Sequence, residues 1–326
     1  MSSGNQQPEG GGHRSSAPPL HRSTVLSAEI IAAIHDLELA ARLVVEGLRT
    51  GGHRSPFHGY TTEFRQHRPY RAGDDLKYLD WKLYARSDRL YTRQFRETTN
   101  LSVMIALDTS ASMAFPPQGL TKFRYGQIVS AALAYLASEE GHAVGLMTMQ
   151  DDKLSYIPAR GGRPHLRSLL ARMDRLETTD AWDPARVIAR SAQLLQRRGV
   201  VIVVSDFYDA EEETRREMRR VAQRGHDVAM LQLVSPQELA LPFTEHVELE
   251  DLESGERRLV DAASLAPKYR AAMSDFLDRC RSHALRDAID YGLMQTDTPP
   301  EVALRQYLLR RSHTSASRGT PRAVAT

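Results

Sequence analysis

The stretch that decides the fold is LSVMIALDTSAS, residues 101–112, in which a short apolar run stops abruptly at an aspartate and two serines. Leu101–Leu107 carries no charge and predicts a buried β-strand. Residues 200–206, VVIVVSD, repeat the arrangement with an almost wholly β-branched run. Such runs are typical of central parallel strands that are covered on both faces. Two buried strands with polar carboxyl ends therefore form the centre of the predicted fold.

Strands and helices alternate on either side of this centre. We expect further strands and helices in the order helix 122–139, strand 142–149, strand 154–159, helix 164–176, helix 184–196, strand 200–205, helix 211–224 and strand 227–234. Alternation of this kind predicts an α/β fold with a doubly wound, mostly parallel sheet and helices on both faces.

The segments that flank this rhythm have other compositions. An apolar seam from Ile30 to Leu48 predicts one helix, and the residues that follow it, rich in aromatic and basic side chains, predict a loop-rich subdomain. After the α/β rhythm we expect a hairpin of 246–250 with 257–261, a helix over 265–285, a strand over 290–295 and a helix over 300–310. The predicted division is a disordered tail (1–24), an N-terminal helix and aromatic, basic subdomain (25–99), the α/β domain (100–236), a C-terminal hairpin and helices packed on the sheet (237–311) and a second disordered tail (312–326).

Composition excludes several classes of protein. Among 326 residues, 43 Lys and Arg face 41 Asp and Glu, and a net charge of +2 gives no general case for binding nucleic acid or an anionic membrane. A single cysteine, Cys280, excludes an internal disulfide and any cysteine-built metal site. The apolar runs are far shorter than the ~18 residues of a membrane span, and the first twenty residues lack the apolar region of a secretion signal. We therefore expect a cytoplasmic protein that does not insert into membranes.

Oxygen-bearing side chains follow the predicted strands where ligands of open parallel sheets bind. They are Asp108, Ser110 and Ser112 after the first strand, Asp206 after the strand at 200–205, and Thr179 in the loop before the helix at 184. An all-oxygen set of this kind suits a hard cation such as Mg²⁺ or Mn²⁺. If Asp108 and Asp206 alone bring charge, and one or both bind through water, the divalent ion stays incompletely neutralised and would attract an acidic side chain of another protein. Hydrolysis would need a second metal or a positioned general base, which these motifs do not provide.

This set resembles the metal-ion-dependent adhesion site of von Willebrand factor type A domains. Asp108, Ser110 and Ser112 match its DxSxS segment, and Asp206 matches its distal aspartate. Thr179 is the best match for the threonine of that site, with Thr178 as the neighbouring alternative. The resemblance implies a von Willebrand type A-like fold and a bound Mg²⁺, with Mn²⁺ or Ca²⁺ as substitutes.

A second resemblance covers residues from about 25 to 311. Gly73-Asp74-Asp75 and Asp80-Trp81, upstream of the DxSxS segment, are similar to the bacterial family called domain of unknown function 58. Members of that family resemble adaptors encoded beside MoxR-type AAA+ ATPases. The resemblance implies an adaptor that works with such an ATPase to assemble or activate other proteins. Together with the charge of the ion, it leads us to expect a non-enzymatic protein whose client offers an acidic side chain. Some members carry transmembrane helices near the N-terminus, and the absence of such a run here implies a cytoplasmic version.

Two other functions stay open at this point. A metal-dependent hydrolase could use the same ion, or an acidic cluster of Glu63, Asp74, Asp75 and Asp80 with His58 or His67. We favour carboxylates that cap turns and pair with Arg65, Arg68, Arg71 and Arg86, because no metal-ligand spacing such as HExxH occurs.

The aromatic, basic stretch 49–100 could instead bind single-stranded nucleic acid. We favour packing of tyrosines against arginines within a subdomain, which makes a nucleic-acid partner the less favoured hypothesis.

Overall fold

The computed structural model describes most of the chain between Ser27 and Arg318. The described ranges are 27–50, 62–71, 79–97, 101–179, 182–195, 197–208, 211–241, 246–250 and 257–318.

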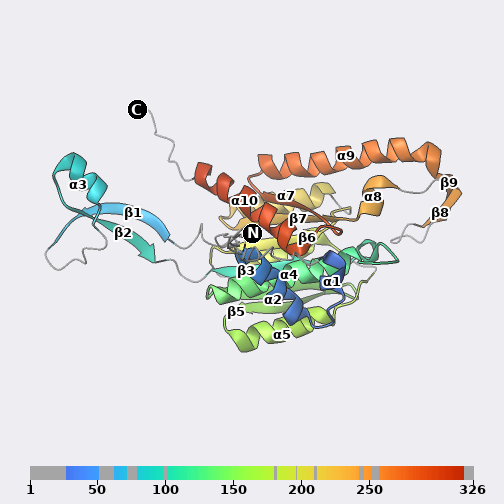
Figure 1. Cartoon of the computed structure of the whole chain (residues 1–326), viewed down its shortest axis with the longest axis horizontal. Helices are drawn as coiled ribbons and strands as arrows, with labels where there is room; N and C mark the ends of the chain where they lie inside the picture. Colours follow the sequence, from blue (N-terminus) through green and yellow to red (C-terminus); the bar gives the residue numbers. More distant parts are fainter. Residues whose placement is uncertain are drawn as a thin grey trace, which may run out of the picture.

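A six-stranded sheet forms the centre of the body (Figure 1). Its strands, in the spatial order β10-β7-β6-β3-β4-β5, are β10 (Asp290–Gln295), β7 (Asp227–Val234), β6 (Val200–Ser205), β3 (Ser102–Leu107), β4 (Ala143–Gln150) and β5 (Lys153–Arg160). All neighbours are parallel except β5, which pairs antiparallel with β4. The chain runs outward from β3 to β5 on one side and from β6 to β10 on the other. The strand order therefore reverses between β3 and β6, where this class of sheet binds ligands.

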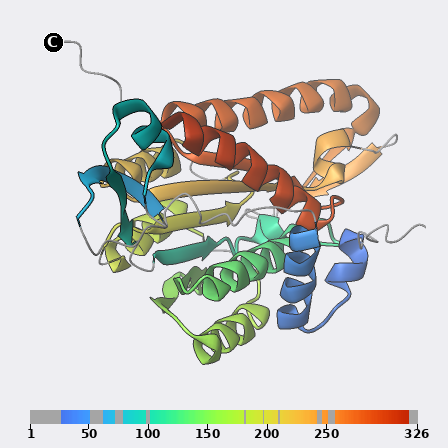
Figure 2. The ribbon, with the colours of Figure 1, turned by 60° about the vertical axis from the view of Figure 1, so that its left-hand side comes forward.

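Helices cover both faces of the sheet, as the alternating pattern predicts (Figures 1 and 2). One face packs against α1 (Ala28–Ala32), α2 (Leu37–Thr50), α4 (Lys122–Glu139), α5 (Arg163–Asp174) and α10 (Pro300–Arg318). The other face packs against α6 (Pro184–Leu194), α7 (Glu211–Gln223) and α9 (Ala262–Arg286). Every residue of β6 is buried because both faces of this strand are covered. The predicted doubly wound α/β fold is confirmed.

Helix α4 lies between the sheet and α2, and its sequence suits that position. Thr121 caps its first turn by accepting a hydrogen bond from the N–H of Arg124. Gly126 faces the sheet, where an added Cβ would lie 3.0 Å from Cδ1 of Leu233. Alanines fill much of the rest of the helix and are buried. Small side chains thus let α4 approach the strands closely, which fixes the direction of its N-terminus.

The predicted single helix over residues 30–48 is wrong. The structure has two helices, α1 and α2, and the side chain of Asp36 starts the second by accepting hydrogen bonds from the N–H groups of Glu38 and Leu39. Ile30, which the seam places in the core, is exposed. The local cap at Asp36 thus competes successfully with continuation of the helix.

The loop-rich subdomain predicted for residues 49–100 contains regular structure. Strand β1 (Thr62–Pro69) pairs antiparallel with β2 (Tyr91–Glu97), and α3 (Trp81–Ser87) lies between them in sequence. We call these three elements the arm. Figures 1 and 2 show that the arm projects from the body at the end where β3 begins. The prediction missed this hairpin because its strands are polar and carry no alternating apolar face.

The C-terminal segment follows the prediction in outline. Strands β8 (His246–Glu250) and β9 (Arg257–Asp261) form the expected hairpin, preceded by a short helix α8 (Pro236–Ala240). Helix α9 begins earlier than expected, at Ala262, and α10 continues to Arg318, into the segment predicted to be a tail. Strand β10 pairs with β7, so this part of the chain supplies the edge strand of the central sheet. In the part of the chain that the structure describes, no helix combines the length and apolar character needed to cross a membrane.

Alanine substitutions at two glycines can measure how closely β4 and β5 are packed. At Gly145, beside an irregularity in the β4–β5 register, an added Cβ would lie 2.7 Å from the carbonyl oxygen of Ile157 and 2.8 Å from the nitrogen of Ala159. Both atoms belong to the backbone and cannot move independently. We expect Gly145→Ala to lower the free energy of unfolding by about 1–3 kcal/mol in urea denaturation. Gly161→Ala, where an added Cβ would meet no atom within 4 Å, should change it by less than about 0.5 kcal/mol. Equal losses in the two variants would contradict this packing.

Candidate metal centre

The loops that follow β3 and β6 meet at the point where the strand order reverses. The N–H of Asp108 donates a hydrogen bond to the carbonyl oxygen of Val204, at 2.9 Å. The carboxylate of Asp108 is fixed at both oxygens. Oδ1 accepts from the N–H of Ser110, at 2.7 Å, and Oδ2 accepts from the hydroxyl of Ser205. The first predicted ligand is therefore held rigidly between the two central strands.

The two serines of the DxSxS segment lead from Asp108 to Asp206. A short 3-10 helix, η3 (Ala111–Ala114), begins directly after Ser110 and curls the chain back. The hydroxyl oxygens of Ser110 and Ser112 lie 3.0 Å apart, and Ser112 Oγ donates to Oδ2 of Asp206 at 2.8 Å. Hydrogen bonds thus link four of the five predicted residues into one continuous cluster.

Thr179 reaches the same edge through its backbone. Its N–H donates to the carbonyl oxygen of Thr109 at 2.6 Å, and the Thr109 hydroxyl in turn donates to the carbonyl oxygen of Met149 at the end of β4. Thr178 and Thr179 are both half-buried. The third loop therefore lies against the DxSxS loop, as the spacing predicts, and the choice between Thr178 and Thr179 as the threonine of the site stays a prediction.

The cluster is largely enclosed. Asp108, Ser110 and Asp206 are each no more than 1% exposed, whereas Ser112 and Thr179 are half-buried. The sequence predicts an ion at an open edge of the sheet, whereas three of these side chains are buried in the structure. Within the cluster Ser112 is the half-buried member, so a partner would have to approach beside it; Thr179, on the adjoining loop, is also half-buried.

The electrostatics of the cluster favour a cation. Burial, and then the charge of Asp206, raise the pKa of Asp108 to about 8, although the hydrogen bonds from Ser205 and Ser110 act in the opposite direction. Two carboxylates held in one buried place repel each other unless a positive charge compensates them. A divalent cation bound between Asp108 and Asp206 would relieve this repulsion.

Lys122 is the functional residue that the sequence analysis missed. It is the first residue of α4, its side chain is 0% exposed, and its Nζ lies 2.6 Å from Oδ2 of Asp206 and 2.5 Å from Oε1 of Glu238. The ammonium also sits 4.7 Å from the centroid of the Tyr208 ring. Burial alone would lower the pKa of Lys122, but Asp206 and Glu238 raise it above its ordinary value, so the group stays charged. The sequence contains one indication of this role, because Lys122 lies at the N-terminus of the predicted helix 122–139. The helix dipole disfavours a cation at that end unless an anion lies beside it.

Glu238 is held in place by its own helix terminus. Its Oε2 accepts from the N–H of Ser235 at 2.8 Å, while Ser235 Oγ accepts from the N–H of Glu238 at 3.2 Å. These reciprocal bonds form a capping box that fixes the first turn of α8. Lys122 therefore connects the oxygen cluster to a second, independently positioned carboxylate.

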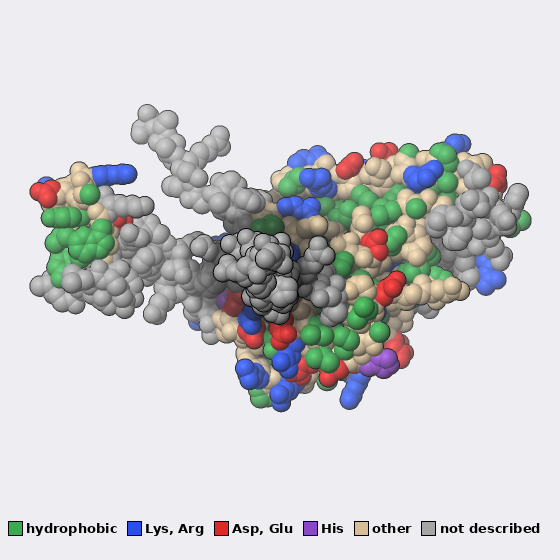
Figure 3. Space-filling model, in the orientation of Figure 1, with side chains coloured by type: hydrophobic (Ala, Val, Ile, Leu, Met, Phe, Trp, Pro, Cys, Tyr) green, Lys and Arg blue, Asp and Glu red, His purple; other side chains and the backbone are tan. Residues whose placement is uncertain are grey.

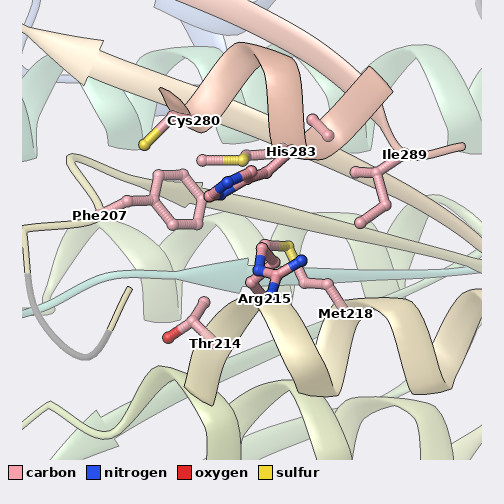
Figure 4. Close-up of a pocket in the computed structure, with 9 residues that line it drawn as sticks. Phe207, Thr214, Arg215, Met218, Cys280, His283 and Ile289 are labelled. Atoms are coloured by element: carbon pink, nitrogen blue, oxygen red, sulfur yellow. The ribbon is translucent and has the colours of Figure 1, made fainter. Parts of the chain in front are cut away.

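The loop that carries Asp206 is anchored by the residue that follows it. Phe207 has a left-handed backbone, with φ of 62°, and its buried side chain lies at a small, largely apolar pocket of about 20 Å³ between α7 and α9. Figure 4 shows the ring extending between Thr214 of α7 and Cys280 of α9. Gln232 adds a hydrogen bond from Nε2 to the carbonyl oxygen of Asp206, at 3.0 Å. We assign this pocket an anchoring role, because it turns Asp206 toward the cluster.

The residues present fit a small divalent cation. Ligand oxygens on adjacent corners of a Mg²⁺ octahedron lie about 2.9 Å apart, given bonds of about 2.0–2.1 Å. The oxygen separations along Ser110, Ser112 and Asp206 are 3.0 and 2.8 Å. The carboxylates of Asp206 and Glu238 carry one more negative charge than Lys122 balances, and Asp108 would add another where a bound cation keeps it ionised. Among the described residues, no three His, Cys, Asp or Glu gather as metal ligands, so the serine hydroxyls are essential to such a site.

The alternative acidic cluster is only partly described, and Asp80 is its described member. Oδ1 of Asp80 accepts from the N–H of Leu83 at 3.0 Å and so caps α3, in agreement with the turn-capping interpretation. The side chains of Glu63, Asp74, Asp75, His58 and His67 lie outside the described residues.

On the face shown in Figure 3, the arm presents hydrophobic side chains, and the body mixes both signs of charge. Trp81 and Tyr84 are exposed, with ring centroids 6.4 Å apart in an edge-on arrangement.

Removal of the buried ammonium should be costly. Lys122→Met keeps the length of the side chain but leaves Asp206 and Glu238 without their shared counter-ion. We expect the free energy of unfolding in metal-free buffer to fall by about 3–5 kcal/mol, because an unpaired buried charge is left behind. Lys153→Met, at an exposed position on β5, serves as the control and should change stability by less than about 0.5 kcal/mol in the same urea titration. A Lys122→Met variant as stable as the control would show that the ion pairs contribute little.

Bacterial proteins are similar to this chain in sequence. An uncharacterized protein of Mycobacterium tuberculosis is 28% identical over 269 residues, which is 82% of this chain and 82% of that protein. The uncharacterized protein YeaD of Bacillus subtilis is 28% identical over 125 residues, or 38% of this chain and 28% of that protein.

Two solved structures are similar at low sequence identity. The conserved hypothetical protein BatB from Bacteroides thetaiotaomicron is 14% identical, with a TM-score of 0.44 over 66% of this chain and 100% of that chain. The SpRpn10 VWA domain is 13% identical, with a TM-score of 0.37 over 64% of this chain and 95% of that chain.

The family described as protein of unknown function DUF58 matches residues 66–281, from within β1 of the arm to within α9. Because the match includes the arm, β3 with its DxSxS loop and β6 with Asp206, and extends over more than half of the sequence, the chain belongs to the DUF58 family.

Proposed function

We propose that the protein is a non-enzymatic adaptor that binds another protein through a divalent cation, with Mg²⁺ as the first candidate and Mn²⁺ or Ca²⁺ as substitutes. The observation that supports this most directly is the oxygen cluster of Asp108, Ser110, Ser112 and Asp206 at the reversal point of the sheet. The threonine loop at Thr179 packs against it. The resemblance of these residues to a metal-ion-dependent adhesion site supports the same conclusion.

The protein groups would leave the cation attractive to an outside carboxylate. Ser110 and Ser112 bring neutral oxygens, and Lys122 already balances part of the charge of Asp206. When bound, the cation would supply a Lewis-acidic position for one carboxylate oxygen of a partner. Ser112 and Thr179, the half-buried members, border the side from which this carboxylate would arrive.

Binding is better supported than hydrolysis. General base catalysis needs a carboxylate or imidazole within reach of the water that it activates. Both oxygens of Asp108 accept hydrogen bonds from Ser110 and Ser205, and Asp206 is held by Ser112 and Lys122. Each carboxylate of the cluster therefore has a positioning role that leaves it poorly placed to accept a proton from a substrate water.

For the partners, we propose a MoxR-type AAA+ ATPase and a client protein that offers an acidic side chain. This part of the proposal rests on the family resemblance of the arm and DxSxS segments and on the charge of the site. Nucleotide hydrolysis would belong to the ATPase, because the sequence has no GxxxxGK[ST] phosphate-binding loop.

Asp108→Ala should remove metal binding and leave the fold largely intact. We expect Mg²⁺ to raise the melting temperature of the wild type and to leave that of Asp108→Ala unchanged, because the cation loses one of its two carboxylates. Asp275→Ala, which removes an exposed carboxylate on α9, should respond to Mg²⁺ like the wild type.

Partner capture provides the functional test. Affinity purification from cell extract with Mg²⁺, followed by mass spectrometry, should recover an ATPase and a client with the wild type and with Asp275→Ala. The client should be lost on addition of a chelator or with Asp108→Ala. Capture that survives both treatments would overturn the metal-dependent adaptor, and metal-stimulated turnover of phosphate or peptide substrates would favour the hydrolase.

A further inference from the structure

We infer that Lys122 competes with the divalent cation for Asp206, and that Glu238 is the anchor to which its ammonium is released when the cation binds. This inference rests on the proposed metal site and adds to it a built-in control of metal affinity. Lys122 and Glu238 then act as positioning residues, because neither is needed as a ligand of the cation.

The argument begins with a single oxygen atom. Oδ2 of Asp206 accepts from Ser112 Oγ at 2.8 Å and from Lys122 Nζ at 2.6 Å. It is therefore both the Asp206 oxygen that faces the serine hydroxyls and the oxygen that the lysine holds. A cation bound to the hydroxyls of Ser110 and Ser112 would therefore need Oδ2 of Asp206 as a ligand, and this oxygen already accepts a hydrogen bond from the Lys122 ammonium.

Sharing that oxygen is unfavourable in this location. Lys122 and Asp206 are almost completely buried, and repulsion between an ammonium and a dication is poorly screened away from water. One of the two positive charges must therefore weaken its contact with Asp206. The cation has Asp108 and the serines as further ligands, which favours displacement of the ammonium.

Glu238 gives the displaced ammonium a fixed destination. Its Oε1 already lies 2.5 Å from Nζ of Lys122, and its other oxygen is tied to the N–H of Ser235. The Tyr208 ring, 4.7 Å from Nζ, lines the same position and favours a cation there. Lys122 can therefore lean toward Glu238 without entering water and without leaving a carboxylate unpaired.

A consequence for the fold is that metal occupancy is linked to α8. This short helix directly follows β7, precedes the β8–β9 hairpin and packs against α9. A stronger Lys122–Glu238 pair in the metal-bound protein would tighten α8 against α4. The metal site and the C-terminal segment would then respond together.

Metal titration of four full-length variants tests the inference. The dissociation constant for Mg²⁺ alone would be measured by isothermal titration calorimetry for the wild type, Lys122→Met, Glu238→Gln and the double variant, and for Mn²⁺ by electron paramagnetic resonance. We expect Lys122→Met to bind about tenfold more tightly or better, because the competitor is gone. A merely destabilised site would bind more weakly, so the sign of the change separates competition from structural damage. Lys153→Met, an exposed change of the same charge, should bind like the wild type.

Glu238→Gln tests the anchor separately and retains an acceptor for the capping box, since glutamine serves at that position. Without the second carboxylate, Lys122 should hold Asp206 more firmly, and the Mg²⁺ affinity should fall at least severalfold. In the Lys122→Met background the same substitution should have little effect, because its influence passes through the lysine. An equal loss in both backgrounds would show a direct field effect of Glu238 and would overturn its role as anchor.

The outcomes separate this inference from the proposed function. Wild-type binding with unchanged affinity in Lys122→Met keeps the metal site and overturns the competition. Binding by Lys122→Met where the wild type binds no metal supports the competition in its strongest form. If neither protein binds a divalent cation, the metal-dependent function falls and this inference falls with it.

Discussion

The structure depends on how the chain compensates three carboxylates that converge where the strand order reverses. Asp108 and Asp206 are buried between β3 and β6, and Glu238 joins them from α8. A lysine ammonium and a set of hydroxyl and backbone donors hold these groups. The result is a cluster that is well ordered but still short of positive charge, a combination that favours a bound cation more than a closed structural ion pair.

The topology of the sheet explains why this cluster exists. Parallel strands end at the same edge, and the reversal of strand order between β3 and β6 leaves a gap into which their following loops can fold. Helix α4 begins at this edge and delivers Lys122, while α8 begins there after β7 and delivers Glu238. The arm precedes β3 and therefore leaves the body at the opposite end of that strand. One strand thus separates the candidate metal centre from the arm.

Much of the fold was predictable from the sequence because its signals are local. The uncharged apolar run of β3 and the β-branched run of β6 each identify an element without knowledge of its neighbours. The two failures also have local causes. Asp36 caps a new helix inside an apolar seam, and the hairpin of the arm has polar strands that lack an alternating apolar face. Whether such segments form regular structure depends on competing hydrogen bonds that are similar in energy.

The sequence by itself determined the α/β class and the position of the oxygen-bearing side chains at strand ends, since the period and polarity of a segment specify which residues end a buried strand. Only the tertiary structure decided the burial of the two aspartates, the convergence of Ser110 and Ser112 on Asp206, and the presence of Lys122 and Glu238 in the same cluster. Lys122 lies 84 residues before Asp206, and Glu238 lies 116 residues after Lys122. No local sequence pattern relates residues this far apart. They come together only when distant elements pack, which places the Lys122 ammonium beside the carboxylates of Asp206 and Glu238.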